Sequence, residues 1–356
     1  NMNDIWKRVS SIGLVVVFLA SVLMSFPLIS AAPPDKCEPW PECKDGGDGE
    51  EPPADPAIAF IKARSKNGKE PNRIAVMNED GERQTVIYSE ARSEHPTWSP
   101  DGGSIAFEAV GTSGWEIWAI DVAVVDDEPQ SSNPRMLANA TACDGRHCVG
   151  PEWSPAGDVI AVYGLWFMSN DGIYLIPKEG IPAGGRAEKI FTPSGENDRA
   201  VMLAWSPNAT QIAFWYGDRS GESVVVSIKI LDLTMSPPQV VKTLVEGGFT
   251  SGSVSCLDWA RTKDELTFVG VPTDGEEKSL YTLDIDTETL TIVTDAGGHP
   301  SWSSDDAQIA FGRAYSSQGG NRGYWKSVVY TIWSIDLETG TETELARDAW
   351  SPDWKR

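Results

Sequence analysis

One phrase recurs six times along this chain of 356 residues: a tryptophan, a tight turn and then a short apolar strand. The tryptophans of the phrase are Trp98, Trp153, Trp205, Trp259, Trp302 and Trp350. After the first five, the apolar strand opens seven residues later, at Ile105, Ile160, Ile212, Leu266 and Ile309. The sixth phrase has no such strand after it, and the apolar segment 57–60 has no phrase before it. We therefore predict a ring closed by pairing of the two ends.

The spacing of the repeat indicates the kind of ring. Successive tryptophans lie 55, 52, 54, 43 and 48 residues apart, and a four-stranded propeller blade takes roughly 40–45 residues, with insertions adding to that. The unit opened by Trp302 contains four strand-like runs, around Trp302 and at 309–311, 327–335 and 341–345. No long stretch after residue 55 has the apolar period of 3.6 that is typical of helices. The sequence predicts an all-β, six-bladed β-propeller over residues 57–356.

The turn that follows the tryptophan has a physical basis. In Ser99-Pro-Asp-Gly102 the proline sets φ for a type I turn, the serine and aspartate can bond the local backbone, and a glycine follows. Large aromatic side chains at a repeated position are expected to pack between neighbouring blades. We interpret all six tryptophans as core residues rather than as a ligand platform.

The repeat resembles a known family. The phrases His-Pro-Thr-Trp98-Ser-Pro-Asp-Gly, Ile105-Ala-Phe and Ile117-Trp-Ala-Ile-Asp121 are similar to the WD-repeat-like, TolB-type β-propeller repeat, and so are the matching phrases around Trp302. The resemblance covers the chain from about Ala57 onward. It implies the propeller fold but leaves the function open, because such repeats occur in TolB, in peptidase propeller domains and in some polysaccharide lyases. TolB also carries an α/β domain before its propeller, and we expect none here.

The N-terminal segment has the pattern of a secretory signal. Lys7 and Arg8 precede an apolar run over 12–26, and small residues at 30–32 suit cleavage. The run is short for a membrane span, which needs about 20 residues, so we predict a cleaved signal peptide over 1–32, with a retained anchor as the alternative. Residues 33–56 are rich in Pro, Gly, Asp and Glu and predict a disordered linker. The chain is expected to be periplasmic or secreted.

The five cysteines fit an exported protein. Cys37 and Cys43 are close enough to pair with each other, as are Cys143 and Cys148, and Cys256 is expected to be free and buried. Neither pair has the spacing of a zinc site. We predict two disulfides, no metal and no cofactor.

Charge and motifs narrow the function classes. The formal net charge is −23, which argues against nucleic acid because its binders need a basic face. The chain has no Gly-x-Ser-x-Gly elbow, no phosphate-binding Gly-x-x-x-x-Gly-Lys loop and no His-Glu-x-x-His motif. We predict no catalytic residue.

The repeat also predicts a channel mouth. The residue three positions before each tryptophan should lie where the inner strand of a blade begins, at one end of the central channel. These residues are His95, Gly150, Met202, Cys256, His299 and Arg347. His147 falls just before this position, and Glu152 and Asp258 directly precede their tryptophans. We interpret this rim as a candidate ligand site; the alternative is that the histidines are only the usual polar residue of the repeat.

A second candidate site comes from two loops on the same face, at 62–73 and 313–326. They are basic and aromatic in an otherwise acidic chain, which is the residue chemistry of binding hot spots. The members are Lys62, Arg64, Lys66, Arg313, Tyr315, Arg322, Tyr324 and Trp325. The alternative is a pair of solvated loops.

The function predicted from these features is a non-enzymatic binding scaffold of the cell envelope. Its partner would be another envelope protein or an extracellular polymer, with no nucleic acid and no membrane span after signal cleavage. The alternative is a carbohydrate-active enzyme, similar to a polysaccharide lyase, that uses the histidine-lined mouth with a metal. A third possibility is a sensor domain whose effector is encoded elsewhere.

Overall fold

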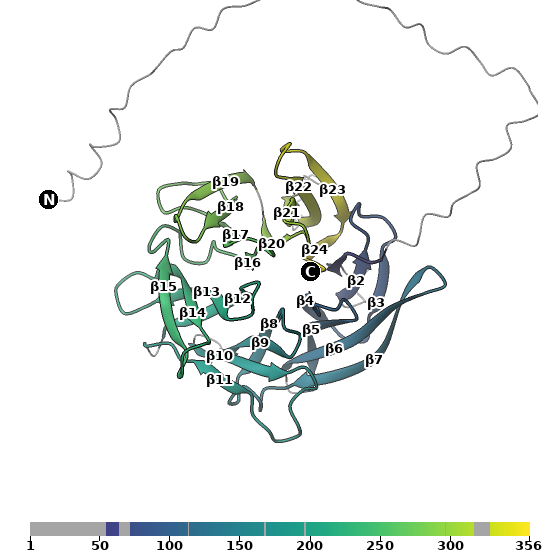
Figure 1. Ribbon diagram of the computed structural model, residues 1–356, viewed down its shortest axis with the longest axis horizontal. Coiled ribbons are helices and arrows are strands. Elements are labelled where there is room, and N and C mark those ends of the chain that lie inside the picture. Colours follow the sequence, from purple (N-terminus) through teal and green to yellow (C-terminus); the bar gives the residue numbers. More distant parts are fainter. Residues whose placement is uncertain are drawn as a thin grey trace, which may run out of the picture. The chain divides into compact units, whose positions relative to one another are not determined.

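The computed structural model describes residues 55–63, 72–112, 114–166, 169–195, 197–295, 297–316 and 328–356. All of them belong to one compact unit, Glu51–Arg356. The predicted signal peptide, nearly all of the linker, and Cys37 and Cys43 lie outside the described residues. The unit is a ring of six four-stranded antiparallel sheets around a central axis (Figure 1), as the repeat predicts.

Each blade runs from an inner strand to an outer strand. The closing blade consists of β24 (Ala349–Trp354), β1 (Ile58–Lys62), β2 (Arg73–Met77) and β3 (Thr85–Tyr88). The second consists of β4 (Ser93–Trp98), β5 (Ser104–Gly111), β6 (Gly114–Val125) and β7 (Glu128–Ala138). The third consists of β8 (His147–Trp153), β9 (Val159–Trp166), β10 (Ser169–Pro177) and β11 (Glu188–Phe191).

The remaining three blades follow the same order. The fourth consists of β12 (Arg199–Trp205), β13 (Gln211–Asp218), β14 (Val225–Asp232) and β15 (Gln239–Leu244). The fifth consists of β16 (Asp258–Trp259), β17 (Glu265–Gly270), β18 (Ser279–Asp284) and β19 (Leu290–Asp295). The sixth consists of β20 (Gly298–Trp302), β21 (Gln308–Ser316), β22 (Val328–Asp336) and β23 (Glu342–Arg347).

The ring closes as predicted, by pairing of its ends. Strand β24 is the inner strand of the closing blade and pairs antiparallel with β1, with Trp354 opposite Ile58. The backbone N–H of Lys355 also donates to the carbonyl of Ala57 at 2.7 Å. Closure in this way gives β1 an inner neighbour and completes the fourth strand of the closing blade.

The register of this pairing corrects the repeat assignment. Trp354 lies opposite Ile58 as Trp98 lies opposite Ile105, so Trp354 is the sixth repeat tryptophan, and the prediction of Trp350 was wrong. Trp350 resembles a repeat tryptophan in sequence because Ser-Pro-Asp follows it, as it follows Trp98. The true phrase is Ser351-Pro-Asp-Trp354, which matches His95-Pro-Thr-Trp98.

The repeat tryptophans form the core between blades, as predicted for five of them. Trp98, Trp153, Trp205, Trp259, Trp302 and Trp354 are each at most 3% exposed. Burial of such a ring removes about 150–250 Å² from water, which is worth on the order of 4–6 kcal/mol as an upper bound. Trp350 is only half-buried. The tryptophan repeat is therefore a device for joining blades.

The turns after the tryptophans share one set of hydrogen bonds. Ser206 Oγ donates to Asn208 Oδ1 at 2.8 Å and accepts from the N–H of Gln211 at 2.9 Å. The equivalent bonds of Ser303 are 2.7 and 2.9 Å long. These bonds fix the turn between the first two strands of a blade and satisfy its backbone.

The inner strands also share a bulge, three residues before the tryptophan. The register shifts between Glu94 and Thr97 in β4, and similar shifts occur in β8, β12 and β20. The residues with positive φ at this position are His95, Gly150, Met202, His299 and Ser351. A left-handed residue in a bulge re-aims its side chain. In three blades the side chain at this position lines the channel, as His95, His299 and Ser351 do.

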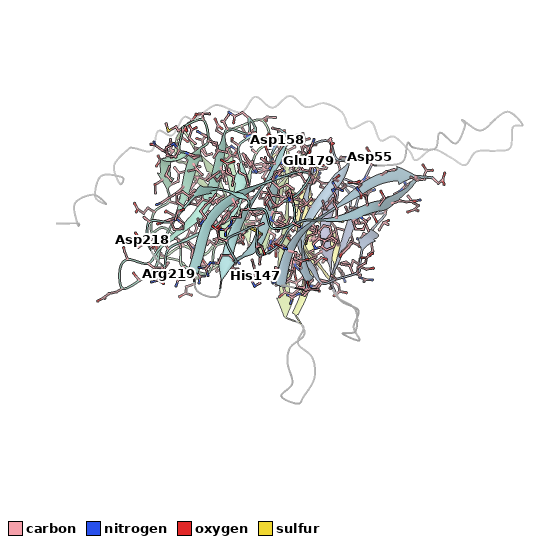
Figure 2. All side chains as sticks on the ribbon, turned by 90° about the horizontal axis from the view of Figure 1, so that it is seen from below. Asp55, His147, Asp158, Glu179, Asp218 and Arg219 are labelled. Atoms are coloured by element: carbon pink, nitrogen blue, oxygen red, sulfur yellow. A yellow bond between two sulfur atoms is a disulfide. The ribbon has the colours of Figure 1, made fainter. Side chains whose placement is uncertain are left out.

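The ring has two distinct faces, seen edge-on in Figure 2. We call one the turn face, because it carries the turns after the tryptophans; Asp158 and Glu179 lie on it. We call the other the bulge face, because the inner strands begin there; His147, Asp218 and Arg219 lie toward it. Within the described part of the chain, no helix is long and apolar enough to cross a membrane.

Candidate functional site

A small cavity occupies the channel near the bulge face. It is bounded by the inner strands β4, β8, β16, β20 and β24 and the residues just before them. It offers about 30 Å³ to the centres of water-sized spheres, and about 10–15 Å³ of such space holds one water. The lining comprises His95, Pro96, Pro151, Glu152, Cys256, Leu257, Asp258, His299, Pro300, Ser351, Pro352 and Asp353. The site therefore has room for waters or an ion.

Two histidines and a cysteine meet in this cavity from three blades. The rings of His95 and His299 lie 5.4 Å apart between centroids. His299 Nδ1 is 3.2 Å from Cys256 Sγ and 3.4 Å from Ser351 Oγ. Cys256 is the cysteine outside the disulfide among those the structure describes, and it is half-buried rather than fully buried.

Glu108, from β5, orients the His95 ring and shifts its pKa. Its Oε1 lies 2.9 Å from His95 Nδ1 and also accepts from the N–H of Gly150 at 2.6 Å. Burial alone would lower the pKa of His95, but the carboxylate of Glu108 outweighs it and raises that pKa. Glu108 thus ties the second and third blades together and orients one histidine.

The other two groups are held in their neutral forms. Burial lowers the pKa of His299 to about 3, helped by the nearby positive charge of His95. Burial raises the pKa of Cys256 to about 12, and the carboxylate of Glu152 adds to this. At neutral pH the cavity therefore contains a neutral imidazole and a thiol side by side.

A layer of carboxyl groups lies next to the histidines. We call Glu152, Asp258 and Asp353 the carboxylate layer; each directly precedes a repeat tryptophan. Burial raises the pKa of Asp353 to about 7, with Asp258 contributing, and burial raises that of Glu152 well above its ordinary value. Arg261 Nη1 donates to Asp258 Oδ1 at 2.9 Å.

Most residues that directly precede a repeat tryptophan have a structural role. The side chain before one tryptophan accepts from the backbone N–H of the next blade's tryptophan. The tryptophan backbone N–H donates to a side-chain oxygen in four such bonds: Trp153 to Thr97 at 3.5 Å, Trp302 to Asp258 at 2.8 Å, Trp354 to Ser301 at 2.9 Å and Trp98 to Asp353 at 2.7 Å. No such bond from the Trp205 N–H to the Glu152 side chain is found among the described residues; Trp205 Nε1 instead donates to the backbone carbonyl of Glu152 at 3.0 Å.

Of the residues predicted for the mouth, the channel cavity brings together five: His95, Cys256, His299, Glu152 and Asp258. Arg347 does not join them: it lies on the outer strand β23, 76% exposed and paired with Glu344. That prediction was wrong because it was counted from Trp350; the equivalent residue is Ser351. His147, whose ring packs against Gly114, is not part of the cavity lining.

A second cavity, of about 360 Å³, opens on the bulge face beside the channel and shares His299 with it. Its aromatic wall consists of Trp350 and Tyr330, whose ring centroids lie 5.4 Å apart. Glu94 organises the opposite side: it accepts from Trp350 Nε1 at 3.1 Å and from Asn72 Nδ2 at 2.8 Å. We call this the bulge-face cavity.

The basic sector predicted from the loops is only partly described. Arg64, Lys66, Arg322, Tyr324, Trp325 and the side chain of Tyr315 lie outside the described residues. Lys62 Nζ donates to Gln84 Oε1 at 2.5 Å. Arg313 is held by Glu342 at 2.7 Å and Asp295 at 3.0 Å, with its side chain only 10% exposed. Arg313 lines the bulge-face cavity, but its charge is already matched by acids.

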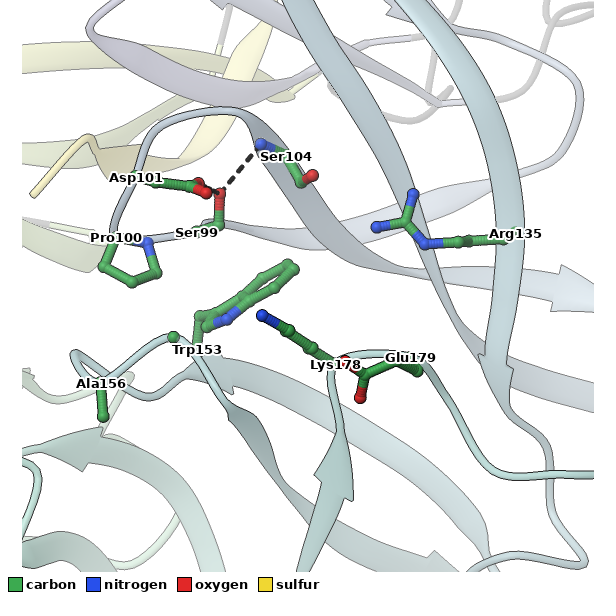
Figure 3. Close-up of a pocket in the computed structure, with 10 residues that line it drawn as sticks. Ser99, Pro100, Asp101, Ser104, Arg135, Trp153, Ala156, Lys178 and Glu179 are labelled. Carbon is green, nitrogen blue, oxygen red and sulfur yellow. Dashed lines mark hydrogen bonds between the residues drawn. The ribbon is translucent and has the colours of Figure 1, made fainter.

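A further cavity of about 430 Å³ lies on the turn face between the second and third blades (Figure 3). In it the Lys178 side chain extends toward Trp153, and Arg135 lies on the opposite side from Pro100. Arg135 is already paired with Asp121 at 2.6 Å, and Ser99 is engaged in its turn. Ser99 and Arg135 of this cavity therefore already have partners within the fold.

The disulfide predicted between Cys143 and Cys148 is present. It clamps the connection between the outer strand β7 and the next inner strand β8 on the bulge face. The predicted pair of Cys37 and Cys43 lies outside the described residues.

Sequence reasoning missed the functional candidates Trp350, Tyr330 and Ser351. Trp350 was assigned to the core, and Tyr330 lies in an apolar strand with no special motif. Ser351 could have been found by aligning Ser351-Pro-Asp-Trp354 with the other phrases, in which a proline stands two residues before the tryptophan at four of the six positions.

Comparison with known proteins agrees with the architecture. No protein-family model matches the chain, and no significant match was found among curated proteins. TolB from Acinetobacter baumannii superposes with a TM-score of 0.57 at 16% identity, over 85% of this chain and 67% of that one. A putative TolB from Agrobacterium tumefaciens gives a TM-score of 0.54 at 15% identity, over 82% and 89%. The chain has the fold of a TolB-type propeller. At these identities the likeness is one of fold.

Proposed function

We propose that this protein is an exported, non-enzymatic binding scaffold of the cell envelope, and that it holds a segment of another envelope protein in the bulge-face cavity. The observation that carries the proposal is the composition of that cavity: Trp350, Tyr330 and Arg92 line about 360 Å³ of open space. Trp, Tyr and Arg are the residues that dominate binding energy at protein interfaces.

These side chains are held in place before any partner binds. Trp350 is hydrogen-bonded to Glu94, and Arg92 Nη2 lies 3.3 Å from the same carboxylate. Arg92 also stacks over Trp115, with its guanidinium carbon 5.2 Å from the ring centroid. Preorganised side chains lose little conformational entropy on binding, which favours affinity.

Exposure supports the same reading. Tyr330 is 44% exposed and the side chain of Arg92 is 59% exposed, so a partner can cover both. The aromatic wall suits an apolar side chain, and Arg92 suits a carbonyl or carboxylate of the same segment. The net charge of −23 disfavours nucleic acid and anionic membrane surfaces as partners.

The envelope location rests on three features. Residues 1–32 have the pattern of a signal peptide, residues 33–56 have that of a linker, and the Cys143–Cys148 disulfide suits an oxidising compartment. Export of a reporter fused to residues 1–56, compared with a fusion in which Lys7 and Arg8 are replaced by Glu, tests this part of the proposal.

The binding role is tested by quantitative capture from an envelope extract. The purified chain and its Trp350→Ala and Tyr330→Ala variants are compared, with Ile292→Ala as the control, since Ile292 is 65% exposed on the outer strand β19. Loss of a hot-spot residue costs about 2 kcal/mol or more, or roughly 30-fold in affinity. Equal capture by the wild-type and Trp350→Ala chains would overturn the proposal, and capture of polysaccharide alone would replace the protein partner with a polymer.

The second candidate function is a carbohydrate-active enzyme that uses the channel histidines with a metal. The convergence of His95 and His299 favours it. The channel cavity is too small for a sugar ring, however, so a substrate would have to approach from the bulge-face cavity. Cleavage of acidic polysaccharides by the wild-type chain, lost in His299→Ala, would support this function over the scaffold.

A further inference from the structure

We propose that His95, Cys256 and His299 form a binding site for a divalent transition metal, with Zn²⁺ as the ion that best fits the ligand set. Their ligand atoms all lie within 4.8 Å of one another. Imidazole nitrogen and thiolate sulfur are ligands typical of Zn²⁺, whereas Ca²⁺ and Mg²⁺ require oxygen.

The three ligands come from different blades. His95 belongs to β4 of the second blade and His299 to β20 of the sixth, while Cys256 directly precedes β16 of the fifth. Cys256 Sγ and His299 Nδ1 are 3.2 Å apart, a distance that two ligands of one tetrahedral ion, bound at about 2.0–2.3 Å, can adopt. The two bulges with positive φ at His95 and His299 direct their rings into this cluster.

Glu108 gives His95 the environment of a metal-binding histidine. Ligating histidines generally donate their other ring N–H to a carboxylate, which fixes the tautomer. His95 Nδ1 is 2.9 Å from Glu108 Oε1, which leaves Nε2 as the ligand atom. Glu108 is itself fixed by the N–H of Gly150 and its side chain is only 5% exposed.

The geometry leaves one coordination position open. Three protein ligands plus a water is the arrangement of zinc sites that are not purely structural. The cavity has about 30 Å³ for such a water, and Ser351 Oγ, 3.4 Å from His299 Nδ1, can hydrogen-bond to it. The carboxylate layer lines the same cavity and offers further oxygen acceptors to that water.

A bound ion would fasten the ring across its channel. A metal at this site would join the second blade to the fifth and sixth, which are not its neighbours in the ring. Because only the folded ring brings the three ligands together, metal binding should raise the melting temperature.

The test is titration of the untagged, chemically reduced full chain with Co²⁺, followed by displacement with Zn²⁺. We expect one equivalent of Co²⁺ to produce a thiolate charge-transfer band and the visible bands of a tetrahedral ion. Cys256→Ser should lose the charge-transfer band, and His299→Gln should bind at least tenfold more weakly. Glu108→Gln should keep the band and weaken binding about 10–100-fold. His147→Gln, a histidine outside the cluster, is the matched control.

Several results would overturn the metal site. One is a wild-type chain that shows no stoichiometric spectral change with Co²⁺. Another is a folded Cys256→Ser chain whose charge-transfer band is unchanged. A third is an equal loss of Co²⁺ affinity in His147→Gln and His299→Gln. Circular dichroism establishes folding of each variant, and His299→Gln gives a second route should Cys256→Ser fail to fold. The experiment involves no partner, so its outcome is independent of the scaffold proposal.

Discussion

The turn face and the channel are built from the same repeat, but they differ in which features recur from blade to blade. On the turn face the residues and their hydrogen bonds recur: the serines at 99, 206 and 303 each accept from a backbone N–H five residues later, at 2.9 Å. At the channel position, three residues before each repeat tryptophan, the left-handed bulge recurs in every blade but the fifth, and the side chains differ in every blade except the two with histidine. These are His95, Gly150, Met202, Cys256, His299 and Ser351.

This difference separates fold from function. A residue that is the same in most blades solves a problem that every blade has, such as forming a turn or packing against a neighbour. A residue that differs between equivalent positions is not required by the fold at that position. The non-equivalent residues of the channel and of the bulge-face cavity are therefore the places where function can lie, and substitutions can test that division.

The largest contrast should come from two tryptophans. Trp302 is fully buried between blades, and its replacement by Ala should lower the free energy of unfolding by about 3–5 kcal/mol. Trp350→Ala should lower it by only about 1 kcal/mol, because Trp350 is half-buried and lies at the cavity. Urea unfolding monitored by circular dichroism gives both values. An equal cost for the two variants would break the distinction between fold and site.

Two arginines provide the next contrast. Arg261 is buried against Asp258, with side chains 8% and 9% exposed, and it also donates to the carbonyl of Trp302. Arg261→Ala should cost about 3 kcal/mol, because it leaves the buried carboxylate of Asp258 with only the more distant Arg356, at 3.8 Å. Arg347→Ala should cost less than about 1 kcal/mol, since Arg347 is 76% exposed beside Glu344. The same urea titration measures both; a large effect of Arg347→Ala would contradict its placement outside the channel.

The pH dependence of stability should report the carboxylate layer. The pKa of Asp353 is raised to about 7 in the folded ring by burial, so the folded state holds this proton more tightly than the unfolded chain does. The contribution is complete below about pH 4 and is lost as the pH rises through about 7, by a few kcal/mol at most.

Asp353→Asn should remove this pH dependence of stability. The amide oxygen of the new side chain can still accept the hydrogen bond that Trp98 N–H donates to Asp353 Oδ2 at 2.7 Å. Unfolding titrations between pH 4 and 8, with a chelator present, compare the two chains. Parallel pH profiles would show that Asp353 titrates normally.

The smallest effect should come from the turns. Ser206→Ala removes two hydrogen bonds of the turn and should cost about 1 kcal/mol. Ser154→Ala should cost less, because Ala156 has no side-chain acceptor at the position of Asn208, and the bond that Ser154 Oγ accepts from the N–H of Ala156 is longer, at 3.2 Å. Differential thermal unfolding can rank them; the reverse order would show that the turns are not held by these bonds.

The sequence predicted the fold in detail where the repeat provided the signal. The four strands predicted around Trp302 correspond to β20–β23, and the ends pair as expected. The error occurred at Trp350, because the apparent phrase that begins there overlaps the true phrase that ends at Trp354. Counting from Trp350 then placed Arg347 in the predicted site in place of Ser351. Burial and charge pairing could not be predicted in the same way, as Arg313 shows: its partners Asp295 and Glu342 are remote in sequence.

The sequence by itself determined the ring, its number of blades and the roles of five repeat tryptophans, because each blade repeats one local solution to turning and packing. Only the tertiary structure decided which non-repeated side chains meet. His95, Cys256 and His299 are separated by up to 204 residues, and they come within 4.8 Å because the ring closes and the bulges turn inward. Local chemistry repeats along a chain, whereas contact across a channel exists only after closure.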